Sequence, residues 1–200
     1  MHNETEIFRT QDILTTVTII YTMEKIKVKD KEFALYISRA EIEKQIDTTA
    51  AVINTELADK NPLFVVVLNG AFIFAADLLR KITIPCEVNF IRVSSYEGVN
   101  TTGQVKEFLG LNQNIENRTV VIVEDIIDTG ITMSMLLDTL GKKNPADIRV
   151  SSLFVKPGKL QVDLKIDYHC FNIDNDFIVG YGLDYDDAGR NLPDIYKIVE

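Results

Sequence analysis

Histidine and cysteine are scarce in this chain of 200 residues, which has two of each. Cys86 and Cys170 lie far apart and outside any CxxC pair, so we expect two buried thiols rather than a disulfide framework. With only His2 and His169, a histidine-rich metal cluster or a Ser/His/Asp hydrolase site has too few members. Thiols of this kind fit a reducing compartment, and we expect a cytoplasmic protein.

Excess basic charge and long apolar runs are also absent. The formal net charge is -9, which provides no field to attract a nucleic acid, and we expect no such partner. The acidic start lacks the order of a signal peptide, and Asn69, Gly70 and Asp77 interrupt the longest apolar region, Phe64 to Leu79. We therefore expect neither export nor a membrane span. The GxGxxG and Walker A phosphate-binding patterns are missing as well.

The composition that remains is that of an ordinary globular protein, with 46% hydrophobic and 26% charged residues. A chain of this length can bury one substantial core, so we expect a single domain over residues 1–200. Strands and helices alternate cleanly only over about residues 38–158. We expect the flanking segments, about 1–37 and 159–200, to form a smaller cap over this core.

Hydrophobic periodicity places the elements of the core. Ser38 and Glu41 have the spacing of a capping box at the start of a helix over about 39–58. Apolar runs that suit strands buried on both faces are found at Leu63–Leu68, Thr119–Val123 and Val150–Val155. Between them we expect helices at Phe72–Lys81 and Ile131–Leu140 and an alternating strand at Glu87–Val93. This alternation predicts an α/β fold with a central, mostly parallel sheet flanked by helices.

The segment from Glu97 to Asn117 contains glycine, asparagine and threonine but no long periodic stretch. It is expected to be a long loop, and long loops in compact enzymes often act as lids.

The residues with the clearest chemistry follow the second buried strand. Glu124, Asp125 and Asp128 lead into a Thr/Gly turn that opens the helix at Ile131, and ligands of open parallel sheets bind at such positions. Amides of the turn and the positive helix end suit a phosphate monoester. Adjacent carboxylates there require a cation or hydroxyl donors, such as Mg²⁺ or the hydroxyls of ribose. A sugar phosphate supplies both partners.

At this point the chain resembles the type I phosphoribosyltransferases, whose signature for 5-phosphoribosyl 1-pyrophosphate is similar to VVIVEDIIDTGIT at residues 120–132. It is also similar to the branch of the family that acts on hypoxanthine and guanine. The matching segments, in chain order, are Leu68–Ala71, Ser94–Tyr96, Lys165, Phe177–Tyr185 and Gly189–Leu192.

The resemblance implies roles for single residues. Glu124 and Asp125 would hold the ribose hydroxyls, and Asp128 would act as the catalytic residue that exchanges a proton with N7 of the purine. The 5-phosphate would bind at Asp128, Thr129, Gly130, Ile131 and Thr132, whereas the pyrophosphate would face Asn69, Gly70, Ser95, Tyr96 and Arg190. Asn69 stands where many relatives have a basic residue, and its side chain can still hydrogen-bond to the pyrophosphate.

On the base side, the resemblance implies that Lys165 donates to O6, that Phe177 stacks on the ring and that the backbone of Ile178 contacts its edge. Asp184 would lie by the purine and ligate Mg²⁺, with Glu124 and Asp125 as further candidate ligands. The expected partners are phosphoribosyl pyrophosphate, a 6-oxopurine, and a second or further copies of the chain in a homodimer or homotetramer.

Two alternatives stay open at this level. The same reaction could use xanthine or another base, because the groups that read position C2 cannot be located from sequence. A nucleotide-sensing regulator could keep the fold without turnover, although it would call for a basic face that this acidic chain lacks.

Overall fold

The computed structural model describes residues 25–96, 105–110 and 113–199. Its elements in chain order are β1 (Lys25–Val28), β2 (Lys31–Ile37), α1 (Arg39–Glu56), β3 (Leu63–Leu68), α2 (Phe72–Leu79), β4 (Glu87–Tyr96), β5 (Val105–Leu109), β6 (Thr119–Ile127), α3 (Ile131–Gly141), β7 (Asp147–Val155), the 3-10 turn η1 (Pro157–Lys159), β8 (Tyr168–Asn172), β9 (Ile178–Val179) and β10 (Ile195–Ile198). No helix in this part of the chain is long and apolar enough to cross a membrane.

The larger sheet has six strands in the order β5-β4-β3-β6-β7-β8. Neighbours from β4 through β8 are parallel, and only β5 runs antiparallel to its neighbour β4. The expected α/β fold with a mostly parallel sheet is confirmed. Because parallel strands end at the same edge, the residues that follow β3, β6 and β7 meet along one side of the sheet.

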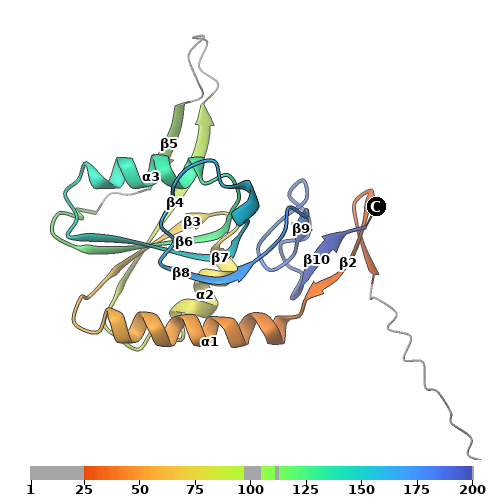
Figure 1. Cartoon of the computed structure of the whole chain (residues 1–200), viewed down its shortest axis with the longest axis horizontal. Helices are drawn as coiled ribbons and strands as arrows, with labels where there is room; N and C mark the ends of the chain where they lie inside the picture. Colours follow the sequence, from red (N-terminus) through yellow and green to blue (C-terminus); the bar gives the residue numbers. More distant parts are fainter. Residues whose placement is uncertain (1–24, 97–104, 111–112, 200) are drawn as a thin grey trace, which may run out of the picture.

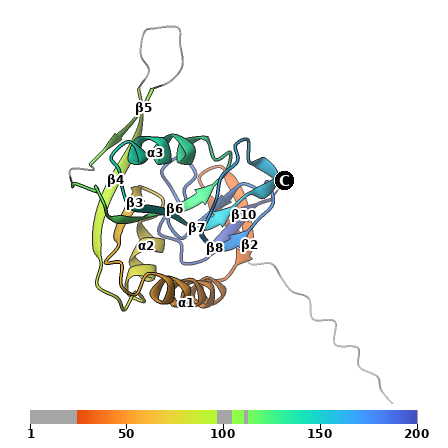
Figure 2. The same cartoon turned by 60° about the vertical axis from the view of Figure 1, so that its left-hand side comes forward.

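Alternating residues of the central strands divide the core into two layers. Phe64 and Val66 of β3 pack in one cluster with α1 and α2, whereas Leu63 and Val65 pack in another with α3. All four are fully buried. This is the period of two that a strand imposes when both of its faces are covered. Figures 1 and 2 show α1 and α2 on one face of the sheet and α3 on the other.

The predicted capping box of α1 is present. The backbone N–H of Ser38 donates to Glu41 Oε2 at 2.9 Å, and the N–H of Glu41 donates to Ser38 Oγ at 3.4 Å. A cap of this kind typically contributes about 1 kcal/mol to helix stability. It fixes the start of α1 directly after β2, where the chain enters the larger sheet.

A second, antiparallel sheet in the order β1-β2-β10-β9 lies beside the carboxyl ends of the parallel strands (Figure 1). It has a small core of its own, formed by Val28, Phe33, Val179 and Tyr196. These strands come from the two segments that were expected to form a cap, although residues 1–24 lie outside the described part. One boundary differs, because β8 was expected in the cap and instead extends the larger sheet beside β7.

The expected long loop is partly a strand. Residues Val105–Leu109 form β5, which pairs with β4 from Arg92↔Leu109 to Tyr96↔Val105, and β4 reaches three residues beyond its expected end at Val93. The short run Val105–Leu109 has no strict alternation of its own, so its pairing with β4 determines its structure. Residues 97–104 lie outside the described part, and the lid stays a prediction.

Candidate active site

Strand β6 delivers the acidic residues to the edge of the sheet. Glu124 and Asp125 lie within its last four residues rather than after its end, and Asp128 follows it directly. Gly130 is the N-cap of α3 and has a φ of 77°, a left-handed conformation that a glycine adopts without steric cost. The chain therefore turns sharply from the buried strand into the helix, as the sequence predicted.

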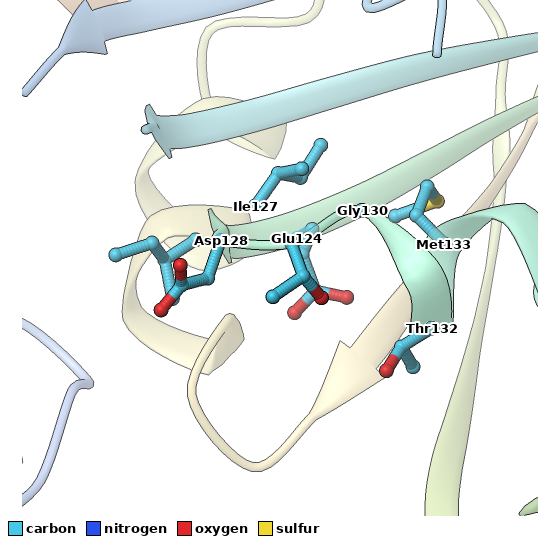
Figure 3. Close-up of a pocket in the computed structure, with 8 residues that line it drawn as sticks. Glu124, Ile127, Asp128, Gly130, Thr132 and Met133 are labelled. Carbon is cyan, nitrogen blue, oxygen red and sulfur yellow. The ribbon is translucent and has the colours of Figure 1, made fainter. Parts of the chain in front are cut away.

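This turn encloses a hollow of about 120 Å³. Its walls are Glu124, Ile126, Ile127, Asp128, Thr129, Gly130, Thr132 and Met133. Figure 3 shows the side chains of Glu124, Asp128 and Thr132 on one side of the strand and turn, with the side chain of Ile127 on the opposite side. Five of the residues that the signature predicted for the sugar phosphate are thus brought together.

The first turn of α3 forms one end of this hollow. The N–H of Ile131 in this turn donates to Thr129 Oγ1 at 3.4 Å. The N–H of Gln161 donates to the carbonyl of Thr129 at 3.0 Å, which fixes the turn from behind. An anion is favoured there by both the amides and the helix dipole.

Glu124 is held in an unusual electrostatic state. Loss of water and the neighbouring carboxylate of Asp125 raise the pKa of Glu124 well above its ordinary value. Asp125 Oδ1 instead accepts the N–H of Ile126 at 2.9 Å. Two crowded carboxylates favour a ligand with hydroxyl donors or a cation, because either relieves their repulsion.

A second hollow, of about 380 Å³, continues from the first across the ends of β3 and β6. The two share Glu124, Ile126 and Thr132. The remaining walls of the second are Val67, Leu68, Asn69, Gly70, Val93, Asp125, Asp184 and Arg190. Three residues predicted to face pyrophosphate, Asn69, Gly70 and Arg190, therefore lie in one pocket beside those predicted to hold the ribose. The peptide bond between Leu68 and Asn69 in this wall is cis.

Gly70 lies tightly between two neighbours. A Cβ atom added to it would be 1.6 Å from Asp125 Oδ2, so no larger residue fits unless that carboxylate moves. On the other side, a Cβ on Gly182 would be 2.1 Å from the carbonyl oxygen of Gly70. The loop after β3 is thus in contact with both the carboxylate of Asp125 and the segment that carries Asp184 and Arg190.

Asp184 and Arg190 are partners of each other. Arg190 Nη2 lies 2.7 Å from Asp184 Oδ1, and its Nη1 donates to the carbonyl of Gly182 at 2.9 Å. The other oxygen of Asp184 accepts the N–H of Asp187 at 2.7 Å. Among the described residues, no three His, Cys, Asp or Glu side chains are grouped to hold a metal ion by themselves.

Asp128 is flanked by two lysines. Its Oδ2 lies 3.3 Å from Lys159 Nζ and 3.7 Å from Lys156 Nζ. Within the described part of the chain, Oδ1 is buried and has no hydrogen-bond partner. Lys156 is only 5% exposed, which is unusual for a lysine. The carboxylate is therefore charge-compensated on one oxygen, whereas its other oxygen is buried without a hydrogen-bond partner.

Lys165, predicted from sequence to face the purine, lines neither hollow. Its side chain is 79% exposed, and its Nζ lies 2.7 Å from Asp167. The sequence predicted no role for Lys156, which lies beside Asp128. The available signal was its place directly after the buried run Val150–Val155, because parallel pairing of Ile127 with Val155 puts the next residue on each strand, Asp128 and Lys156, side by side.

Phe177 and Ile178 come from the smaller sheet. The Phe177 ring is 44% exposed and packs on Phe33 and Tyr185, with centroids 6.3 and 5.8 Å away. Ile178 is buried in β9. The exposed aromatic face is open for stacking, although neither residue lines the two hollows. Ser95 and Tyr96 lie on β4, and their side chains are outside the described part.

Known proteins share both the sequence and the fold. A family model described as a phosphoribosyl transferase domain matches residues 36–186. A hypoxanthine-guanine phosphoribosyltransferase of Streptococcus mutans is 40% identical over 176 residues, which cover 88% of this chain and 89% of that protein. A hypoxanthine-guanine-xanthine phosphoribosyltransferase of Tritrichomonas foetus is 42% identical over 165 residues, which cover 82% and 90%.

Solved structures agree with the sequence matches. A Trypanosoma cruzi hypoxanthine phosphoribosyltransferase, solved as a mutant in a ternary substrates complex, superimposes with a TM-score of 0.77 at 35% identity and covers 88% of this chain and 96% of that one. A Bacillus anthracis hypoxanthine-guanine phosphoribosyltransferase gives a TM-score of 0.75 at 34% identity, with 88% and 99% covered. The corner between β6 and α3, the five parallel strands and these matches agree, and the chain belongs to the phosphoribosyltransferase family, with the type I fold.

Proposed function

We propose that this protein transfers the 5-phosphoribosyl group of phosphoribosyl pyrophosphate to hypoxanthine, and also to guanine, in purine salvage. The products would be the nucleoside monophosphate and pyrophosphate. One observation carries the proposal: Glu124 and the N-terminal turn of α3 line one hollow, which continues into a second that is lined by Asp125 and Arg190. A sugar with a phosphate at one end and a pyrophosphate at the other matches the order in which these protein groups lie along the two hollows.

Binding of the sugar follows from the corner itself. The 5-phosphate would lie against the N–H groups of residues 129–132, which donate without a lysine. Glu124 and Asp125 would accept hydrogen bonds from the 2- and 3-hydroxyls of ribose. Since hydroxyl donors stabilise ionised carboxylates, sugar binding would lower the raised pKa of Glu124 toward its ordinary value.

The pyrophosphate would occupy the second hollow. Arg190 would exchange Asp184 for phosphate oxygens, to which a guanidinium donates in pairs. The freed Asp184 carboxylate, with Glu124 and Asp125 nearby in the same hollow, offers the hard oxygen donors that Mg²⁺ prefers when phosphates supply its other ligands. When bound, Mg²⁺ would neutralise the charge that grows on the leaving pyrophosphate.

Asp128 has the position of a general base. Departure of pyrophosphate leaves an electron-poor, oxocarbenium-like C1 on the ribose, and N9 of the purine attacks it. Asp128, which lines the first hollow, would take the proton at N7, which increases electron density on the ring as N9 attacks. General base catalysis of this kind typically contributes about 10²- to 10⁴-fold in rate.

Lys156 is the better candidate than Lys165 for recognition of the 6-oxo group. N7 and O6 lie on the same edge of a 6-oxopurine, so a base at N7 places O6 beside a cation that neighbours Asp128. Lys156 is such a cation, at 3.7 Å from Asp128 Oδ2, whereas Lys165 points to solvent. Phe177 would stack on the ring, with the backbone of Ile178 at its edge and Asp184 close to the base.

Matched lysine variants test this assignment. Lys156→Met should lower kcat/KM for hypoxanthine by about tenfold or more, because a buried charged donor to O6 is lost. Lys165→Met should leave it within twofold. Steady-state kinetics with hypoxanthine as the varied substrate compare the two variants. The reverse order of effects would restore Lys165 as the purine-binding residue.

Purified protein with phosphoribosyl pyrophosphate and Mg²⁺ tests the function itself. Hypoxanthine, guanine, xanthine and adenine are offered in turn, and nucleotide formation is followed by absorbance. We expect turnover with hypoxanthine and guanine. Turnover with xanthine alone would make xanthine the substrate in place of hypoxanthine and guanine. Binding of phosphoribosyl pyrophosphate without turnover of any base would favour a nucleotide-sensing regulator.

Compartment and assembly complete the proposal. Both cysteines are free thiols, which supports a reducing, cytoplasmic setting. A homodimer or homotetramer is proposed from family membership, and light scattering would measure it.

A further inference from the structure

A buried hydrogen bond joins two segments that are far apart in the sequence. The hydroxyl of Tyr181 donates to Asp77 Oδ2. Tyr181 is 2% exposed and Asp77 is 8% exposed, so both side chains are buried. Asp77 lies on α2, whereas Tyr181 follows β9. Neither residue has a role in the chemistry proposed above.

The backbone at Tyr181 is in an uncommon conformation. Its φ is 49°, and the flanking Gly180 and Gly182 both have a φ of 104°. Left-handed backbone is unfavourable for a bulky aromatic residue by about 1–2 kcal/mol. The segment keeps this shape through the N–H of Tyr181, which donates to Leu192 at 2.8 Å, and that of Gly182, which donates to Arg190 at 2.9 Å.

This segment forms part of the proposed pyrophosphate site. Gly182 touches the carbonyl of Gly70, and it also accepts Arg190 Nη1 at 2.9 Å. Gly70 lies two residues before α2 begins at Phe72. The bond between Tyr181 and Asp77 therefore connects the helix behind the Gly70 loop to the segment that carries Arg190.

The second oxygen of Asp77 is engaged as well, because Oδ1 pairs with Arg80 on the same helix. This contact leaves Oδ2 facing Tyr181. Burial and the bond to Asp77 raise the pKa of Tyr181 above its ordinary value, so its hydroxyl stays protonated and donates throughout the neutral range.

We propose that Tyr181 and Asp77 are a positioning pair that sets the affinity of the enzyme for the pyrophosphate group of its substrate and product. The pair holds the Gly70 loop and Arg190 in register where both line the second hollow. It does not touch the substrate. The inference rests on the proposed function, since it takes this hollow as the pyrophosphate site.

Tyr181→Phe removes only the hydroxyl and tests the pair. We expect the KM for phosphoribosyl pyrophosphate and the inhibition constant of pyrophosphate to rise together by about fivefold or more, with the KM for hypoxanthine within twofold. The shared rise is expected because both ligands use the same hollow, which the base does not occupy.

Tyr168→Phe is the matched control. Tyr168 is 5% exposed and donates to Glu56 Oε2 at 2.9 Å, so its variant also loses one buried hydroxyl and a bond to a carboxylate. It lies on β8 and lines neither hollow. We expect a similar loss of thermal stability in the two variants and altered pyrophosphate constants only in Tyr181→Phe.

Two variants of Asp77 complete the test. Asp77→Asn keeps an oxygen that accepts from Tyr181, and we expect nearly wild-type pyrophosphate constants. Asp77→Ala leaves the hydroxyl without its acceptor, and we expect the same loss as in Tyr181→Phe. Asp77→Ala also serves as the deciding variant if Tyr181→Phe does not fold.

Pyrophosphate constants within twofold of wild type in both Tyr181→Phe and Asp77→Ala would overturn the proposal. An equal rise in Tyr168→Phe, or an equal rise in the KM for hypoxanthine, would do the same. Calorimetric titration with Mg²⁺ and pyrophosphate separates this result from the proposed function. Wild-type protein that binds pyrophosphate but makes no nucleotide would refute the function, and the variants would still test the pair by binding.

Discussion

Gly70→Ala is expected to disable the proposed ribose site through a single added methyl group. The new Cβ would be 1.6 Å from Asp125 Oδ2 and 2.4 Å from its Cγ, whereas real Cβ atoms essentially never come within 3.0 Å of such neighbours. The carboxylate must therefore move by more than an ångström. Gly70 does not have a positive φ, so the effect is steric and not one of backbone strain.

The size of the effect follows from that displacement. Moving the Asp125 side chain off its rotamer costs about 0.5–1.5 kcal/mol, which lowers Tm by only a few degrees in a chain of this length. A catalytic or binding group misplaced by about 1 Å, in contrast, can cost about 10²-fold in rate. We expect kcat/KM for phosphoribosyl pyrophosphate to fall by about 10²-fold with a small change in thermal stability.

Steady-state kinetics and thermal melts measure the two quantities side by side. Gly141→Ala is the control, because apart from its chain neighbours and the backbone of its own helix, no atom of the described residues lies within 4 Å of the Cβ it would add. In an Asp125→Ala background, Gly70→Ala should cost little more, since the clashing carboxylate is gone. A Gly70→Ala enzyme with wild-type kcat/KM for phosphoribosyl pyrophosphate would refute the reasoning.

Two further predictions concern the acidic residues. Asp128→Asn should lower kcat by at least about tenfold with KM values nearly unchanged, and unchanged turnover in a steady-state assay would remove Asp128 from the role of general base. Glu124→Gln should raise the Tm of the ligand-free protein at neutral pH while it weakens sugar binding. Because the folded-state pKa of Glu124 is raised, the wild-type protein loses stability as pH rises from the ordinary pKa of 4.5 toward the folded-state pKa. The gap in Tm between variant and wild type should therefore widen from about pH 4.5 upward. A gap that does not change with pH would contradict this.

The sequence predicted the central sheet and its acidic corner because their signals are local. Leu63–Leu68 is apolar throughout, which suits a strand covered on both faces, and the glycine at position 130 permits the turn into α3. Strand β5 was not predicted, since its pairing with β4 is a contact between segments rather than a property of Val105–Leu109. β8 was expected in the cap and not in the larger sheet, because its alternation of buried and exposed residues spans only five positions.

The site was predictable where residues follow one another along the chain and less so where they meet in space. Glu124, Asp125 and Asp128 occur in one signature. Lys156 lies 28 positions from Asp128 in the sequence, and only the register of β6 against β7 brings the two together. The tight contact of Gly70 with Asp125 likewise depends on the ends of two parallel strands.

A crystal structure of the protein soaked with phosphoribosyl pyrophosphate and Mg²⁺ tests the central claim most directly. We predict density for the 5-phosphate against the N–H groups of residues 129–132, with the ribose hydroxyls on Glu124 and Asp125 and the pyrophosphate beside Arg190. A ligand bound elsewhere, with the corner between β6 and α3 empty, would contradict the account.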